Sequence, residues 1–254
     1  MKKIALVTGA TSGIGMACAT ALAAASYRVI ITGRNTAALD SLADRLAREH
    51  GPESVCKLVF DVCNLEACRE AIGSLPADWQ AVDVLVNNAG LALGLEPEYE
   101  GDPADWYTMI DTNIKGVLNM TRIIVPGMIE RGRGHVINMG SVAGDAAYAG
   151  GNVYCATKSA VKAITDGLRI DVAHTPLRVT LIKPGLVETN FSRVRFHGDN
   201  ERADNVYKGI EPLTADDIAD TVVYAAQAPA HVQIAEMLVL ATHQANGSFI
   251  YREK

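Results

Sequence analysis

The chain has 254 residues, of which 49% are hydrophobic and 20% charged, and its formal net charge is −6. This composition is typical of a globular protein with a sizeable core, and the length suits a single α/β domain. The acidic balance without Lys/Arg runs argues against a nucleic-acid partner, and the lack of a long apolar stretch argues against a membrane span.

The distribution of cysteines and histidines favours neither a disulfide framework nor a metal site. Five cysteines form no Cys-x-x-Cys pair, and six histidines are scattered singly. We therefore expect reduced thiols and no bound metal. Because the chain passes from Met1-Lys2-Lys3 straight into a strand-like run, without the features of a signal peptide, we expect a cytoplasmic protein.

Short apolar runs alternate with helix-period segments along the chain. The runs predicted as strands are Ile4–Val7, Val29–Thr32, Val55–Phe60, Val84–Val86, His135–Met139, Arg178–Ile182 and Met237–Leu240. The predicted helices are Gly13–Ala25, Thr36–Glu49, Asp105–Glu130, Asn152–Ala173 and Thr214–Ala226. Because the strands are continuously apolar, we expect a parallel sheet buried on both faces. The sequence predicts one α/β domain over residues 1–254, a doubly wound, Rossmann-like sheet of about seven strands.

Two segments fall outside this alternation. Residues 188–212 are polar and mixed in charge, and lie between a strand and the last predicted helix. They form either a solvated loop or, as we favour in this architecture, a lid over a substrate site. Residues 242–254 form a C-terminal tail.

The run Thr8-Gly9-Ala10-Thr11-Ser12-Gly13-Ile14-Gly15 follows the first strand and opens the first helix. Glycines suit a tight strand-to-helix turn, close backbone approach to a phosphate and close contact between helix and sheet. The helix N-terminus offers free N–H groups to a pyrophosphate. The spacing Gly-x-x-x-Gly-x-Gly differs from the usual dinucleotide fingerprint, but its context predicts a dinucleotide site at Gly9, Thr11, Ser12, Gly13, Ile14 and Gly15.

The end of the second strand indicates which dinucleotide binds. NAD-binding folds usually place an acid there for the ribose 2′-hydroxyl, but this strand ends Ile31-Thr32-Gly33-Arg34-Asn35. The Arg34 guanidinium would attract a 2′-phosphate that an acid would repel. The sequence therefore predicts NADP(H) as the cofactor.

A group of polar residues further along carries the chemistry. Tyr154 and Lys158 are four residues apart in a predicted helix, so both side chains leave the same face. Ser141 follows the strand His135–Met139, at a carboxyl end where open α/β sheets place ligands. Asn113 lies in another predicted helix, where an Asn is mildly unfavourable.

Several motifs occur together in this sequence: the glycine turn, Asn87-Asn88-Ala89-Gly90, Asn113, Ser141, Tyr154-x-x-x-Lys158 and Pro184-Gly185. With these motifs the chain resembles the short-chain dehydrogenase/reductase family over essentially its whole length. The resemblance implies that Tyr154 is the proton donor, Ser141 polarises the substrate carbonyl and Lys158 holds the nicotinamide ribose. It also implies that Asn113 orders a water of the proton relay. The implied cofactor contacts are Asp61 and Val62 beside the adenine, Thr189 at the carboxamide, and Asn87, Ala89, Gly90, Tyr154, Lys158, Pro184, Gly185 and Val187.

The chemistry of a phenol supports these roles. A tyrosine with a pKa near 10 is a poor acid–base group at neutral pH unless a nearby cation stabilises the phenolate. Lys158, one helical turn from Tyr154, supplies that charge. Hydride transfer belongs to the cofactor, whereas the protein orients the carbonyl and protonates the developing alkoxide.

Three further sequence runs indicate which class of substrate the protein takes. The runs 88–94, 109–113 and 148–154 look like the NADP-dependent 3-hydroxy acid (serine) dehydrogenases and the similar sulfoacetaldehyde reductases. Ala146-Ala147 stand where the hydroxy acid group usually has Trp-Pro, a loss of volume that could suit a tetrahedral sulfonate. We therefore expect NADPH-dependent reduction of sulfoacetaldehyde to isethionate, with 3-hydroxy acid dehydrogenation as the alternative.

The anionic end of such a substrate needs a partner. We nominate Arg195 in the lid segment, with Tyr148 as a second donor. Gln244 is a further candidate, because the resemblance implies a homotetramer and the tail could reach a neighbouring site. Two other classes stay open: a non-catalytic nucleotide-binding regulator, and a reductase of bulkier alcohols, which the polar stretch 193–204 disfavours.

Overall fold

The predicted apolar runs form one parallel sheet. In the computed structural model, which describes residues 2–252, the strands are β1 (Ile4–Val7), β2 (Arg28–Gly33), β3 (Val55–Val59), β4 (Val82–Asn87), β5 (His135–Met139), β6 (Arg178–Pro184) and β7 (Glu236–Val239). Their order is β3-β2-β1-β4-β5-β6-β7, and neighbouring strands are parallel. The doubly wound sheet is confirmed.

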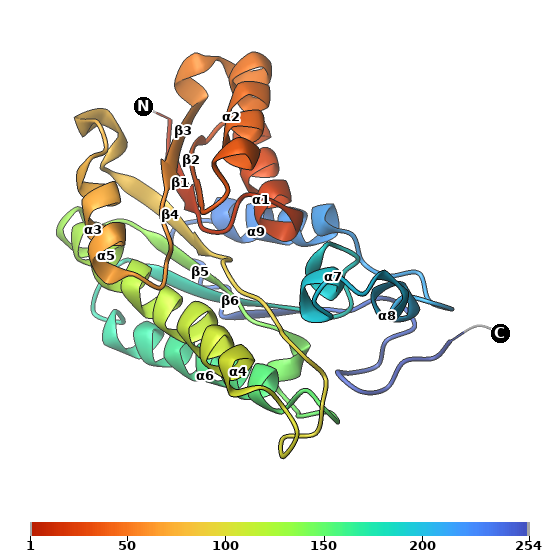
Figure 1. Ribbon diagram of the computed structural model, residues 1–254. Helices are drawn as coiled ribbons and strands as arrows, with labels where there is room; N and C mark the ends of the chain where they lie inside the picture. The colour runs from red at the N-terminus through yellow and green to blue at the C-terminus, as the bar shows by residue number, and fades with distance from the viewer. Residues whose placement is uncertain (1, 253–254) are drawn as a thin grey trace.

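Helices cover both faces of the sheet (Figure 1). They are α1 (Gly13–Ala24), α2 (Thr36–His50), α3 (Leu65–Gly73), α4 (Pro103–Ile110), α5 (Gly116–Glu130), α6 (Asn152–Asp171), α7 (Phe191–Arg195), α8 (Asn200–Asn205) and α9 (Ala215–Gln227). Helices α1, α2 and α9 lie on one face, and α3, α4, α5 and α6 lie on the other (Figure 1). None of the helices in residues 2–252 has both the length and the apolar character needed to cross a bilayer.

Alternate residues of the central strand pack into different cores. Ala5 and Val7 of β1 join the cluster shared with α1 and α9, whereas Ile4 and Leu6 join the cluster shared with α5. All four are at most 4% exposed. The continuous apolar character of β1 follows from this burial on both faces.

The long helix predicted over Asp105–Glu130 is interrupted. A π-helical turn, η3 (Asp111–Lys115), separates α4 from α5. A π turn spaces its hydrogen bonds one residue wider than an α-helix, so apolar periodicity does not mark it, and such turns often occur at functional sites. Helices α3, α7 and α8 were not predicted; the last two are five and six residues long.

The strand order reverses between β1 and β4, and this reversal positions the site. In open α/β sheets ligands bind outside the carboxyl ends of the strands at such a point. Helices α7 and α8, from the predicted lid segment, lie beside this edge together with the C-terminal tail (Figure 1). An isolated bridge between Gln244 and Ile250 folds the tail on itself. The tail is held at this edge by Gln244, whose Oε1 accepts from the N–H of Leu186 at 2.8 Å, and by Arg252, which donates to the carbonyl oxygen of Val206 at 3.0 Å.

Candidate active site

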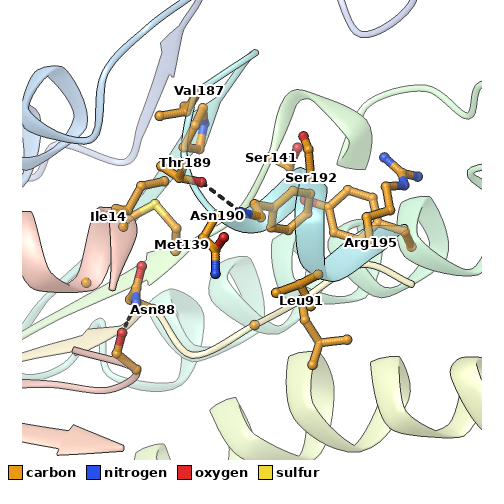
Figure 2. Close-up of a pocket in the computed structure, with 18 of the residues that line it drawn as sticks. Ile14, Asn88, Leu91, Met139, Ser141, Val187, Thr189, Asn190, Ser192 and Arg195 are labelled. Carbon is orange, nitrogen blue, oxygen red and sulfur yellow. Dashed lines mark hydrogen bonds between the residues drawn. The ribbon is translucent and has the colours of Figure 1, made fainter. Parts of the chain in front are cut away.

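A cavity of about 440 Å³ opens at the carboxyl ends of the strands. It runs from the turn after β1 to the lid segment, with Ile14 and Asn88 toward one end and Arg195 at the other (Figure 2). The predicted site residues that line it are Gly9, Thr11, Ser12, Gly13, Ile14, Gly15, Arg34, Asp61, Val62, Ala89, Gly90, Ser141, Tyr148, Tyr154, Lys158, Pro184, Gly185, Val187, Thr189, Arg195 and Gln244. Asn87 and Asn113 do not line it.

The glycine turn is shaped to bring backbone close to a ligand. Gly9 and Gly13 have φ angles of 66° and 50°, which favour glycine. A Cβ on Gly15 would lie 2.2 Å from the carbonyl oxygen of Gly9, so only hydrogen fits there. Ser12 makes no side-chain cap at the N-terminus of α1, which faces the cavity. The turn thus fits a dinucleotide pyrophosphate.

Arg34 lies beside the turn with its guanidinium available. Its side chain is 67% exposed, and Nη1 lies 3.4 Å from Oδ2 of Asp61. Burial acts to raise the pKa of Asp61, but hydrogen bonds from Cys63 and the charge of Arg34 hold it below its ordinary value. A mostly exposed guanidinium with one long contact can bind a phosphate as well.

Ser141 is fixed in the turn that follows β5. It caps the 3-10 turn η4 (Val142–Gly144), where its Oγ accepts a hydrogen bond from the backbone N–H of Ala143 at 3.1 Å. The hydroxyl can in addition donate its own proton. The side chain is buried and lines the cavity.

Tyr154 and Lys158 project from α6, and both are buried. Lys158 donates from Nζ to the carbonyl oxygen of Met139 at 2.9 Å, and Nζ lies 5.9 Å from the centre of the Tyr154 ring. Burial lowers the pKa of Lys158 to about 8. Burial also raises the pKa of Tyr154, against the opposing effect of the Ser141 hydroxyl. The site therefore holds a neutral phenol next to a cation.

Asn113, in the π turn, uses its amide to hold neighbouring segments. Oδ1 accepts from the N–H of Leu91 at 2.9 Å, while Nδ2 donates to the carbonyl oxygen of Leu91 at 2.8 Å and to Oγ1 of Thr157 at 3.0 Å. Asn113 thus joins the loop after β4 to α6. Its part in a water relay stays a prediction.

Asn87 is turned away from the cavity. It is 3% exposed, and its Nδ2 donates to Oδ1 of Asn138 at 2.9 Å. The side chain therefore links β4 to β5, and the contact of Asn87 with the cofactor stays a prediction. The neighbouring Asn88, which was not among the predicted contacts, lines the cavity and donates to the carbonyl oxygens of Thr8 and Gly9 at 2.9 and 3.2 Å.

Arg195 forms the far end of the cavity together with Tyr148. Its Nη2 donates to the Tyr148 hydroxyl at 2.8 Å and its Nε to the carbonyl oxygen of Gly94 at 3.1 Å. The guanidinium carbon lies 5.5 Å from the centre of the Tyr154 ring. Within residues 2–252, no carboxylate forms an ion pair with Arg195. A held cation without a counter-charge suits an anionic ligand.

Gln244 lies in the cavity wall of its own chain. It is 6% exposed; Oε1 accepts from the N–H of Leu186 at 2.8 Å and Nε2 donates to the carbonyl oxygen of Asn246 at 3.1 Å. Both amide atoms thus hold the tail against the loop after β6. Whether the tail also reaches a neighbouring site stays a prediction.

The comparisons with known proteins agree with this arrangement. Residues 3–200 match the family model described as short chain dehydrogenase. The chain belongs to this family.

Several members of the family are close relatives. The NADP-dependent 3-hydroxy acid dehydrogenase of Salmonella typhi is 51% identical over 232 residues, covering 91% of this chain and 92% of the relative. A probable NADP-dependent dehydrogenase of Haemophilus influenzae is 47% identical over 254 residues, covering 98% of each. The closed form of a serine dehydrogenase complexed with NADP+ superposes with a TM-score of 0.93 at 44% identity, covering 99% of this chain and 100% of that one.

Some residues that line the cavity of this chain could not be predicted from its sequence. Tyr207 lines it and holds the lid segment, because its hydroxyl lies 2.7 Å from Oγ of Ser192 and donates to the carbonyl oxygen of Val187 at 3.0 Å. No motif marks these residues. Ala146 and Ala147, the positions that suggested a sulfonate, are exposed and do not line the cavity. Among residues 2–252, no cluster of three or more His, Cys, Asp or Glu could hold a metal ion.

Proposed function

We propose that this short-chain dehydrogenase interconverts a short 3-hydroxy acid and its carbonyl form with NADP(H). The observation that carries the proposal is Arg195, a cation without a carboxylate partner in residues 2–252, at the end of the cavity that holds Ser141 and Tyr154. The names of the relatives, 3-hydroxy acid dehydrogenase and serine dehydrogenase, support the same substrate class.

The residues present fit NADP(H). The N-terminus of α1 would hold the pyrophosphate, Arg34 the 2′-phosphate and Lys158 the nicotinamide ribose. Asp61 and Val62 would flank the adenine. Bound NADP(H) supplies or accepts the hydride. The remaining predicted contacts would complete the site at the turn (Gly9, Thr11, Ser12, Gly13, Ile14, Gly15) and around the nicotinamide (Ala89, Gly90, Pro184, Gly185, Val187, Thr189).

The protein's own groups handle the proton. In the direction of reduction, the Ser141 hydroxyl donates a hydrogen bond to the carbonyl oxygen, and the phenol of Tyr154 transfers its proton to that oxygen as negative charge develops there. The charge on Lys158 stabilises the phenolate that remains. In the direction of oxidation, the Tyr154 oxygen, deprotonated with the help of Lys158, would take the hydroxyl proton, and bound NADP+ would accept the carbinol hydrogen as hydride.

The carboxylate of the substrate, bound by Arg195, would set the orientation of so small a molecule in the cavity. Arg195 can donate two parallel hydrogen bonds to a carboxylate, and Tyr148 holds the guanidinium in place. We place sulfoacetaldehyde second, because the alanines that favoured it, Ala146 and Ala147, lie outside the cavity. We further propose that residues 188–212 act as a lid over this end and that the protein is a cytoplasmic homotetramer.

A substrate panel tests the proposal. The quantity to measure is kcat/KM with NADPH for malonic semialdehyde, sulfoacetaldehyde and the neutral aldehyde butanal. We expect the highest value for malonic semialdehyde and the lowest for butanal. A higher kcat/KM for sulfoacetaldehyde would favour the sulfonate as the substrate. Equal kcat/KM values for all three aldehydes would show that the cavity does not recognise the anionic group.

A further inference from the structure

The carboxylate of Asp145, which has no role in the proposed proton transfer, links the turn after Ser141 to two neighbouring segments. Asp145 directly follows η4, and its two oxygens accept hydrogen bonds from different lysines. Nζ of Lys183 lies 2.7 Å from Oδ2, and Nζ of Lys162 lies 3.2 Å from Oδ1. Lys183 belongs to β6 and Lys162 to α6, so Asp145 connects three segments that meet at the cavity.

Lys183 is an unusual residue for the inside of a sheet. Its side chain is only 5% exposed, and it also forms an ion pair with Glu236 of β7. Burial acts to lower the pKa of Lys183, but its hydrogen bonds to Asp145 and Glu236 raise it above the ordinary value. A buried ammonium without such partners is costly, so the ion pair with Lys183 favours this position of Asp145, whose own side chain is 32% exposed.

The turn η4, which precedes Asp145, packs directly against α6, the helix that carries Tyr154 and Lys158. A Cβ on Gly144 would lie 2.8 Å from the carbonyl oxygen of Lys158. Oγ of Ser159 donates to the carbonyl oxygen of Gly144 at 2.9 Å. A shift of this turn would therefore change the place of Ser141 relative to Lys158 and to Tyr154, one helical turn earlier.

We propose that Asp145, held by Lys183 and Lys162, is a positioning residue that sets Ser141 relative to Tyr154. The inference rests on the proposed function, in which Ser141 binds the carbonyl oxygen. It follows from the geometry of catalysis, since a misplacement of about 1 Å can cost roughly 10²-fold in rate. The ion pairs act through Ser141 and need not touch the substrate.

The test measures kcat and KM for oxidation of 3-hydroxypropionate with NADP+, using Asp145→Ala and Lys183→Met in the full-length enzyme. We expect kcat to fall by about 10- to 100-fold, while KM for NADP+ changes by less than about twofold. Lys183→Arg, which keeps the charge, should recover most of the rate. Asp145→Asn, of nearly the same shape, provides the same measurement in place of an alanine variant that does not fold.

A matched control separates positioning from stability. Asp83 is a buried carboxylate on β4 that accepts from Nε of Arg133 at 2.8 Å and from the N–H of Ile4 at 2.9 Å. It lies at the opposite end of the strands from the cavity. Asp83→Asn should lower the unfolding temperature and leave kcat unchanged.

A double-mutant comparison with Ser141→Ala decides the inference. Ser141→Ala alone should lower kcat, and adding Asp145→Ala should cause little further loss if both act through the same hydroxyl. If Ser141→Ala keeps the wild-type kcat, the proposed function itself fails. If Ser141→Ala loses activity while Asp145→Ala and Lys183→Met behave like Asp83→Asn, only the positioning role is overturned.

Discussion

The guanidinium of Arg195 and the phenol of Tyr148 form one unit at the end of the cavity. Nη2 donates to the Tyr148 hydroxyl at 2.8 Å, and the guanidinium carbon lies 5.4 Å from the centre of that ring. Burial raises the pKa of Tyr148, although Arg195 has the opposite effect, so the hydroxyl stays neutral. The pair therefore retains a net positive charge for an anionic substrate.

Replacing Arg195 should weaken binding of anionic substrates selectively. We expect Arg195→Ala to raise KM for malonic semialdehyde by about 1.5–3 kcal/mol, the range for hydrogen bonds to charged groups, or roughly 10- to 150-fold. KM for butanal should hardly change. Arg193→Ala is the matched control, because Arg193 lies on the same short helix, is exposed and does not line the cavity. An equal effect of Arg195→Ala on both aldehydes would make Arg195 a structural residue of the lid segment.

Arg34 should determine the choice between the two nicotinamide cofactors. Changing Arg34 to Asp removes an attraction to the 2′-phosphate and adds a repulsion, so the ratio of kcat/KM for NADPH over NADH should reverse. Steady-state kinetics with each cofactor measure this ratio. Arg48→Asp, an exposed position on α2 outside the cavity, controls for the change in net charge. Equal use of both cofactors by the unmodified enzyme would contradict the assignment.

The pH dependence of reduction should reflect Lys158. Since burial lowers its pKa to about 8, the free enzyme loses this charge as the pH rises through that value. The phenolate left by Tyr154 then lacks its cation, so kcat/KM for NADPH at saturating aldehyde should fall above about pH 8. Lys158→Arg should move the decline to higher pH, because a guanidinium stays protonated. A decline at the same pH in both enzymes would assign it to another group.

The glycine turn should not tolerate even one methyl group at its closest point. Gly15→Ala should lower the free energy of unfolding by about 1–3 kcal/mol, the usual cost of overpacking, and should weaken NADPH binding. Gly167→Ala is the control: it lies inside α6, where a Cβ meets nothing within 4 Å, so helix propensity should make this variant slightly more stable. Urea unfolding and NADPH fluorescence titration measure both effects. Unchanged binding and stability in Gly15→Ala would contradict the close approach.

The sheet could be predicted because burial on both faces leaves continuous apolar runs, as in β1 and in Val29–Ile31 of β2. The turn glycines and the Tyr154–Lys158 pair could be placed because their spacing is fixed by local geometry. The π turn at Asn113 could not be predicted from local pattern, and the side-chain partners of Asn113, Leu91 and Thr157, lie elsewhere in the chain.

Residues of the substrate end were harder to interpret from sequence. The small side chains of Ala146 and Ala147 predict added space at the site, but both residues are exposed, because the direction of this loop depends on packing rather than on local pattern. This is why the sequence placed the sulfonate first, whereas the relatives support the 3-hydroxy acid alternative. Gln244 lines the cavity of its own chain, and its reach toward a neighbouring site stays a prediction.

The central claim is that Tyr154 transfers the proton in an NADP(H)-dependent reaction, and kcat of Tyr154→Phe with malonic semialdehyde tests it most directly. We expect a loss of roughly 10²-fold or more, the usual contribution of general acid catalysis, with NADPH binding retained. Tyr27→Phe is the matched control, since Tyr27 is a buried tyrosine whose hydroxyl donates to Ala226, away from the cavity, and it should keep the wild-type rate. A Tyr154→Phe enzyme that keeps more than about a tenth of the wild-type kcat would show that another group donates the proton.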